Sequence, residues 1–290
     1  MTERKARCLA KTTGFTEGPV IRPDGEVVFL SCHIGQVNYV KDGRCMVLGN
    51  VGGAPNGATE SVDGTIYVTQ TGGRWGMNTS PDHRLNSGIQ SVSRDGSVAW
   101  VTTDPIAPND LCFGPDGFLY VTDPTRHRTP RDDGRLFKVD VRTGQAELLC
   151  SVAWYPNGIA FGLEDDAVYV ADSWKGRIFR MPLDSIRSGK AETYIQMEPG
   201  FTPDGFMFDV EGNLTIAAVH YYGKESGQLH TYDRNGKLID AFEPEPNKIY
   251  TNVALGPDRM LVIADATSEA MMAVDNWPHA GLALHPFRGI

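Results

Sequence analysis

The sequence predicts an all-β fold, a six-bladed β-propeller, from three observations. A strand–turn–strand pattern recurs six times, the repeats start about 47 residues apart, and a chain of 290 residues holds six units of that length. Further strand-like runs lie between the recurring hairpins, so each unit contains about four strands, as propeller blades do. The 32 glycines and 18 prolines are spread along the whole chain, which favours short strands and turns over helices.

Each repeat begins with a polar residue, continues with about four strand residues and a turn, and ends in a more apolar strand. The six first residues, which we call the openers, are Glu17, Asn56, Asn109, Asn157, Asp204 and Asn252. Consecutive openers are 39, 53, 48, 47 and 48 residues apart. Three of the turns contain Asp-Gly, as in Asp24-Gly25, which is a strong hairpin signal between alternating strands.

One domain over residues 1–290 accounts for all six repeats, because neither a linker nor a low-complexity segment interrupts them. A propeller ring must close, and we expect residues 6–11 to supply the outer strand of the last blade. The irregular residues 72–85 lengthen the second repeat. A short turn of helix is expected only within residues 181–190.

Composition excludes several classes of function. The net charge is −9 and no run of lysine and arginine stands out, which argues against nucleic acid as a partner. No apolar run of membrane-spanning length and no apolar leader is seen, so no membrane association is expected. The five dispersed cysteines predict reduced thiols and a cytoplasmic location. The oligomeric state stays open between monomer and homodimer.

The openers predict a metal site. Innermost strands line the central channel of a propeller, so six aligned openers lie around one axis. All six offer an oxygen and two are acidic, which suits a hard divalent cation such as calcium, magnesium or manganese, with zinc less expected. Taken alone, Asn157-Gly158 is only a turn signal, and we expect Gly158 to lie in a turn.

The loops that return to the opener end predict the walls of a small-molecule pocket. Because strands within a blade are antiparallel, the loops after each second strand lie on the same face as the openers. They contain histidine and aromatic residues, namely His33, Trp75, His83, His127 between Arg126 and Arg128, Trp174, His220 and Tyr221. Each alone is an ordinary loop residue, but together around a polar site they resemble a binding pocket.

Four segments resemble the gluconolactonase/regucalcin (senescence marker protein) family over nearly the whole chain. They are "FTEGPV", "PNDLCFGPDGFLYVTDP", "YPNGIAFGLEDDAVYVADS" and "PDGFMFDVEGNLTIAA", and the segment "PNDLCFGPDGFLYVTDP" is most similar to the bacterial gluconolactonase branch. The resemblance implies one divalent metal, calcium favoured, at the top of the channel. It implies Glu17, Asn157 and Asp204 as ligands. Asn109 would complete the metal shell or contact substrate, and Asn56 and Asn252 are second-tier candidates.

The function implied by the resemblance is metal-dependent hydrolysis of a small lactone. It implies that Asp204 acts as general base or holds the base water, although a nucleophilic role stays open, as do His33, His127 and His220 as acid–base groups. Ala107 stands where regucalcin-type members carry an arginine that contacts a sugar acid, so the substrate stays open.

Three rival functions stay open beside the lactonase. They are a phosphotriesterase-like hydrolase, an isomerase or lyase using the same metal site, and a non-catalytic calcium-binding or interaction propeller. No G-x-S-x-G or P-loop motif is present, so a serine hydrolase and a nucleotide site lack support.

Overall fold

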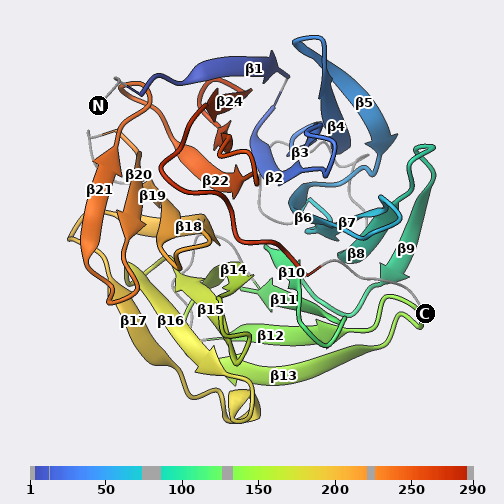
Figure 1. The fold of residues 1–290 in the computed structure, drawn as a ribbon. Coiled ribbons are helices and arrows are strands. Elements are labelled where there is room, and N and C mark those ends of the chain that lie inside the picture. Colours follow the sequence, from blue (N-terminus) through green and yellow to red (C-terminus); the bar gives the residue numbers. More distant parts are fainter. Residues whose placement is uncertain (1–3, 13, 74–85, 126–132, 221–225, 286–290) are drawn as a thin grey trace.

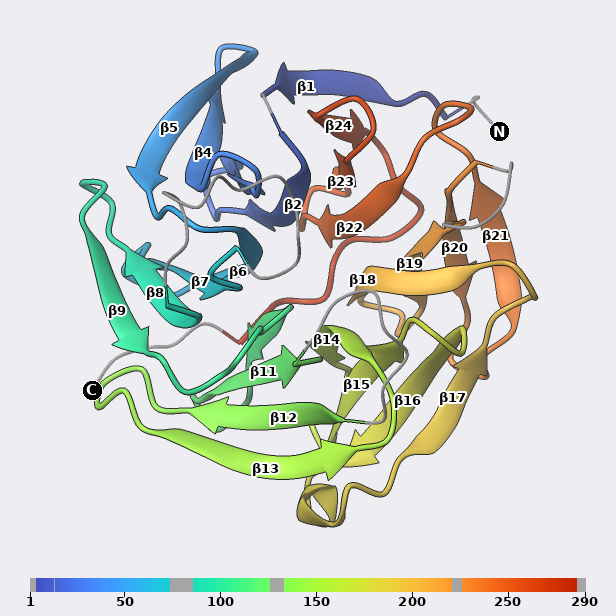
Figure 2. The same cartoon turned by 180° about the vertical axis from the view of Figure 1, so that it is seen from behind.

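The computed structural model describes residues 4–12, 14–73, 86–125, 133–220 and 226–285. Within these residues the chain forms six four-stranded antiparallel sheets arranged as the blades of a propeller, which confirms the predicted fold (Figures 1 and 2). The innermost strands pack against one another around the ring. Among the described residues, no helix has the length and apolarity needed to cross a bilayer.

In five blades the four strands run outward from the channel in chain order, and in the last blade β1 lies outside β24. The innermost strands are β2 (Thr16–Ile21), β6 (Pro55–Glu60), β10 (Leu111–Phe113), β14 (Pro156–Phe161), β18 (Thr202–Phe208) and β22 (Tyr250–Leu255). The second strands are β3 (Val27–Ser31), β7 (Ile66–Gln70), β11 (Leu119–Asp123), β15 (Ala167–Asp172), β19 (Leu214–Val219) and β23 (Leu261–Asp265). The third strands are β4 (Gln36–Lys41), β8 (Gly88–Val92), β12 (Gly134–Val139), β16 (Arg177–Pro182), β20 (Gln228–Tyr232) and β24 (Ala270–Val274). The outer strands are β5 (Arg44–Asn50), β9 (Val98–Thr102), β13 (Ala146–Val152), β17 (Glu192–Gln196), β21 (Leu238–Phe242) and, for the last blade, β1 (Arg7–Lys11). We number the blades 1 to 6 from β2 onward.

The ring is closed by the N-terminal strand, as predicted. β1 pairs antiparallel with β24, with Arg7 opposite Ala273 and Lys11 opposite Ala270 (Figure 1). The expected turn of helix is the short 3-10 helix Ile186–Ser188.

The apolar core lies between neighbouring blades. Val28 and Leu30 of blade 1 pack in one buried cluster with Ile66 and Val68 of blade 2. The second strands are enclosed by neighbouring strands and blades. Every residue of β3 is therefore buried, although its side chains point alternately to the two faces of the sheet. The outer strands are half solvated, and β21 shows no fully buried residue.

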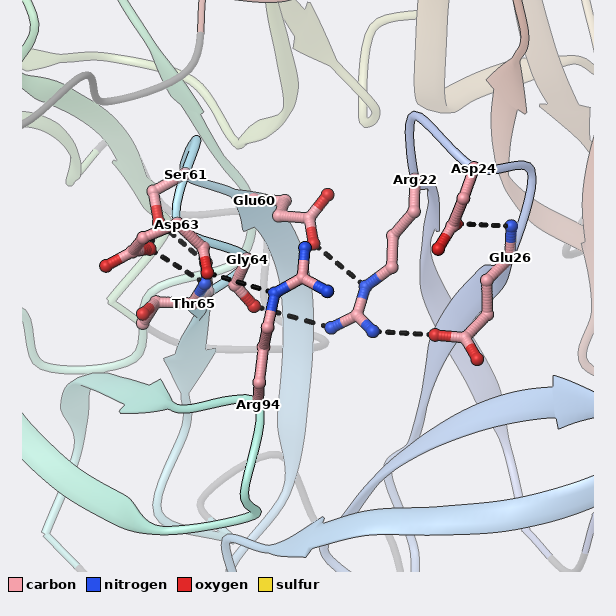
Figure 3. A network of polar contacts seen from close by, with 9 residues as sticks. All are labelled: Arg22, Asp24, Glu26, Glu60, Ser61, Asp63, Gly64, Thr65 and Arg94. Carbon is pink, nitrogen blue, oxygen red and sulfur yellow. Dashed lines mark hydrogen bonds and ion pairs between the residues drawn. The ribbon is translucent and has the colours of Figure 1, made fainter.

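A buried ion pair joins blades 1 and 2 at the end of the ring opposite the openers (Figure 3). Arg22 follows β2 directly, and its Nε lies 2.8 Å from Oε1 of Glu60, the last residue of β6. Nη1 of Arg22 donates to Glu26 Oε2 at 2.6 Å and Nη2 donates to the Gly64 carbonyl at 3.4 Å. Burial raises the pKa of Glu60, while the charges of Arg22 and Arg94 lower it.

Replacement of Arg22 by methionine is expected to lower the free energy of unfolding by about 3 kcal/mol, because it leaves the buried Glu60 without its guanidinium partner. The double variant Arg22→Met/Glu60→Gln is expected to recover most of that loss. Arg142→Met removes an exposed pair with Asp140 and should cost under about 1 kcal/mol. Urea denaturation measures all three; equal losses for Arg22→Met and Arg142→Met would contradict this role of the buried pair.

The segment after β24 crosses the turn end of the channel. Trp277 is buried, and the chain then donates from Leu282 N to the Phe208 carbonyl of blade 5 at 2.9 Å. His285 Nε2 lies 2.7 Å from Asp165 Oδ1 of blade 4. In Figure 1 this segment, in red, runs across the middle of the ring. Residues 282–285 line a cavity together with inner-strand residues, so the cavity lies inside the channel.

Candidate functional site

The six openers occupy corresponding positions at one end of the inner strands. Glu17, Asn56 and Asn157 are the second residues of β2, β6 and β14, Asp204 and Asn252 are the third residues of β18 and β22, and Asn109 lies two residues before β10. Asn252 is half-buried and the other five are buried. We call this group of six residues the opener site.

A β-bulge accompanies the opener in five of the six inner strands. The pairing with the second strand shifts at Glu17/Val20, Pro55/Ala58, Pro156/Ile159, Pro203/Phe206 and Tyr250/Asn252. A bulge inserts one extra residue and re-aims the side chains next to it, and bulges are common beside active sites. The sequence does not reveal these bulges, because they depend on which residues pair across strands.

The prediction that Gly158 lies in a turn is wrong. Gly158 is inside β14, and a Cβ there would lie 2.4 Å from the Asp204 carbonyl oxygen. Gly205 likewise follows an opener, and a Cβ there would lie 2.0 Å from the Asn252 side chain. A glycine after these openers therefore lets the next inner strand approach closely.

The variant Gly158→Ala is expected to lower the free energy of unfolding by about 1–3 kcal/mol, because the new methyl group meets backbone atoms that cannot rotate away. Gly256→Ala is the control, since its Cβ first meets the side-chain oxygen of Asp258, and that variant should lose less. Urea denaturation measures both. A fully stable Gly158→Ala protein would show that the inner strands are not packed this closely.

Glu17 is held in a fixed orientation in an acidic environment. Its Oε2 accepts hydrogen bonds from Gly18 N at 3.0 Å and from Asn252 Nδ2 at 3.2 Å. Burial raises the pKa of Glu17 well above its usual range, and the negative charges of Asp204 and Asp110 raise it further. Because Asn252 also accepts from Val253 N at 2.8 Å through Oδ1, its side chain supports Glu17.

Asn157 is also fixed by a side-chain hydrogen bond. Its Nδ2 donates to Ser173 Oγ at 3.0 Å, and this hydroxyl donates to the Pro203 carbonyl at 2.6 Å. Pro203 precedes Asp204, so Ser173 links the Asn157 side chain to the strand that carries Asp204. With Nδ2 engaged, the side-chain oxygen of Asn157 is the atom suited to a cation.

Tyr155 belongs to the site and was missed by sequence reasoning. It is buried, and its hydroxyl is hydrogen-bonded to Asn109. Burial and then the charge of Asp204 raise its pKa, so the phenol stays protonated at neutral pH. Its ring packs edge-to-face on Trp174 with centroids 5.8 Å apart. The signal was the aromatic residue two positions before the opener Asn157.

Asp110 is a further site residue that the repeat pattern did not single out. It follows Asn109, lines the cavity in the channel together with Cys112, and accepts a hydrogen bond from Leu111 N at 2.8 Å. Burial raises the pKa of Asp110 to about 7. Its charge contributes to the acidic environment of Glu17.

The structure locates three of the predicted pocket-wall residues at the opener end. His33 follows β3, and its Nδ1 accepts from Phe15 N at 3.3 Å. Trp174 follows β15 and contacts Tyr155, and His220 follows β19 with its ring 5.2 Å from Phe201. Trp75, His127 and Tyr221 lie outside the described residues, as do His83, Arg126 and Arg128.

Ala107 is fully buried and its backbone is anchored. Ala107 N donates to Asp123 Oδ1 at 3.0 Å, and Ile106 N donates to Asp123 Oδ2 at 2.9 Å. Asp123 also pairs with Arg135. The methyl group of Ala107 contributes no charge and no hydrogen bond at this position.

The donor chemistry of the opener site fits a hard divalent cation. The site contains two acidic residues, Glu17 and Asp204, and four asparagines. The two charges that raise the pKa of Glu17 are those of Asp204 and Asp110. A divalent ion would offset this accumulated negative charge. Within the described part of the chain, no group of three or more His, Cys, Asp or Glu side chains could hold a metal, so amide oxygens would have to complete the ligand set.

Known proteins similar to this chain point to one protein family and share its propeller fold. The family model described as "SMP-30/Gluconolactonase/LRE-like region" matches residues 15–267. The adipocyte plasma membrane-associated protein of Mus musculus is 25% identical over 220 residues, which are 67% of this chain and 51% of that protein. A gluconolactonase of Zymomonas mobilis is 25% identical over 219 residues, 69% of this chain and 57% of that protein. The chain thus spans about half the length of these relatives.

Among solved structures, a calcium-binding protein, regucalcin, from Agrobacterium tumefaciens has the same fold. It superposes with a TM-score of 0.76 at 20% identity and covers 99% of this chain and 98% of its own. Identity this low shows the architecture alone.

Proposed function

Because the chain belongs to the SMP-30/gluconolactonase/LRE-like family, we propose that it is a lactonase that opens a small lactone with the help of one divalent metal ion. The observation that supports this most is that two acids, Glu17 and Asp204, are buried at the opener end of the channel, where the charge of Asp204 helps to raise the pKa of Glu17. Burying these charges costs stability, and a propeller that only binds other proteins has no use for buried acids in its channel.

In this proposal Glu17, Asn157 and Asp204 hold the ion, with Asn109 completing the shell or contacting substrate. Calcium is favoured, with magnesium, manganese or zinc as alternatives. When bound, the ion supplies Lewis acidity toward the lactone carbonyl and lowers the pKa of a water. The other contributions to the hydrolysis, namely proton transfer and orientation of the substrate, come from side chains of the protein.

Asp204 accepts a proton from the water that attacks the carbonyl carbon of the lactone. The bond between this carbon and the ring oxygen then breaks, and the proton passes to the released oxygen, which yields a hydroxy acid. Asn109, held by Tyr155, is placed to orient the substrate. The buried setting strengthens these polar interactions relative to water.

The walls favour a substrate less polar than a sugar acid. Ala107 contributes only a buried methyl group, and the ring of Trp174 packs on the ring of the buried Tyr155 at the same end of the channel. We therefore propose a lactone with an apolar substituent as the substrate class. His33 and His220 complete the proposed wall as far as the described residues go.

Removal of divalent ions is expected to abolish hydrolysis. A panel of apolar lactones, sugar lactones and organophosphate triesters, followed with a pH indicator, should show turnover of apolar lactones that EDTA stops and calcium restores. Turnover that persists in EDTA would contradict the metal site. Hydrolysis of the phosphotriesters alone would overturn the lactonase and favour the phosphotriesterase-like alternative, and a product without added water would favour a lyase or isomerase.

A further inference from the structure

We propose that four buried hydroxyl groups, which we call the inter-blade hydroxyls, position the openers and set the affinity of the opener site for a divalent ion. They belong to Thr69, Thr122, Ser173 and Thr251. This inference rests on the proposed function. These are positioning residues, because their hydrogen bonds reach the backbone that carries the openers.

Thr69 and Thr122 make the same pair of hydrogen bonds in two consecutive blades. Gly57 N donates to Thr69 Oγ1 at 2.7 Å, and this hydroxyl donates to the Asn109 carbonyl at 2.6 Å. Asp110 N donates to Thr122 Oγ1 at 3.0 Å, and this hydroxyl donates to the Asn157 carbonyl at 2.7 Å. Each hydroxyl thus joins the residue after its own opener to the opener of the next blade.

Ser173 and Thr251 extend the pattern to the two acidic openers. Ser173 Oγ donates to the carbonyl of Pro203 at 2.6 Å, directly before Asp204. Thr251 Oγ1 donates to the carbonyl of Thr16 at 3.0 Å, directly before Glu17. All four hydroxyls therefore donate from one blade to the following blade, and the acceptor is the carbonyl of a proposed metal-site residue or of the residue directly before it.

These hydrogen bonds fix the spacing between the inner strands of neighbouring blades, which are not joined by strand pairing. The openers come from different blades, and each blade pairs its strands only within itself. All four hydroxyl-bearing residues are buried, with Thr69, Thr122 and Thr251 fully so, and water cannot replace the lost partner of a buried carbonyl. Because a cation needs its ligands at defined distances, a loosened spacing weakens binding.

If the inter-blade hydroxyls only stabilised the fold, their loss would not change metal affinity more than the loss of any other buried hydroxyl. Thr215 provides the control for this alternative. Its hydroxyl is buried and lies 3.1 Å from the hydroxyl of Thr231, so this pair joins two strands within blade 5. Loss of the Thr215 hydroxyl should reduce stability without changing the spacing of the openers.

The test compares Thr122→Val, Thr122→Ser and Thr215→Val by calorimetric calcium titration of the full chain, with thermal denaturation in EDTA alongside. Thr122→Val should bind calcium about tenfold more weakly than wild type. Thr122→Ser and Thr215→Val should stay within about twofold, since neither removes the inter-blade hydrogen bond. If Thr122→Val does not fold, Thr251→Val takes its place.

Unchanged calcium affinity in Thr122→Val, or an equal loss in Thr215→Val, would overturn the positioning role. The proposed function is tested separately in the same titration. If wild type binds no divalent ion, or binds it equally well in Glu17→Gln, the metal site itself is wrong and the positioning role is lost with it.

Discussion

Replacement of Asp204 by asparagine is expected to lower kcat for lactone hydrolysis by at least about 100-fold, the contribution of a well-placed general base. The amide keeps an oxygen for a cation but cannot accept the proton of the attacking water. Because the variant also loses a charged ligand, its calcium binding should weaken too, and kcat is therefore compared with both proteins saturated with calcium. Initial rates on the lactone that wild type prefers, with calcium titration of the same sample, measure the two effects separately.

Asp209→Asn is the matched control, because it makes the same change in the same blade at the opposite end of the inner strand. Asp209 is also buried, and it accepts from Glu211 N and Asn213 N in the turn after β18. The oxygen of an asparagine can keep these two bonds, and only the bond that Asp209 Oδ2 accepts from Asn213 Nδ2 is lost, so activity should stay near wild type. If Asp204→Asn retains wild-type kcat, the base is another group, and His33 and His220 become the next candidates.

Replacement of Glu17 by glutamine is expected to weaken calcium binding by about 100-fold, because affinity at oxygen sites depends on the number of charged ligands. At a calcium concentration of 100 times the wild-type Kd, wild type gains about 2.7 kcal/mol of stability and the variant gains about 0.4 kcal/mol. Without calcium the variant should be at least as stable as wild type, because one of two like charges in a buried site is gone.

Glu60→Gln separates this effect from the general loss of a buried carboxylate. Glu60 ends an inner strand at the far end of the channel and pairs with Arg22. Its replacement should change stability but leave the gain from calcium intact. A gain from calcium that is equal in Glu17→Gln and wild type would remove Glu17 from the ligand set.

The repeat pattern predicted the fold and the place of the openers because both are local. A polar opener, a short strand and an Asp-Gly turn are each specified within about fifteen residues, and their recurrence gives the number of blades. The closing strand β1 could be predicted because the last repeat lacks a fourth strand, which the ring needs in order to close. These inferences needed no knowledge of contacts between blades.

Features that depend on contacts between blades escaped the sequence. Gly158 resembled part of a turn, yet its role is to admit the Asp204 backbone of the next blade. Tyr155 carries no signal in the repeat pattern, yet its hydroxyl is hydrogen-bonded to Asn109 of an adjacent blade. Thr69 and Thr122 stand in the similar runs "YVTQ" and "YVTD", but only the structure shows where their hydroxyls donate.

The closure of the ring by β1 has a consequence for how the protein is made. Arg7 leaves the ribosome long before its partner Ala273 in β24, because 265 residues separate the two in sequence. β1 therefore has no pairing partner while the blades between it and β24 are made in order. Contacts this distant in sequence form slowly. Until they form, the unpaired β1 is a place where a nascent chain can pair with a neighbouring one, which makes the closure of the ring the step most exposed to misassembly.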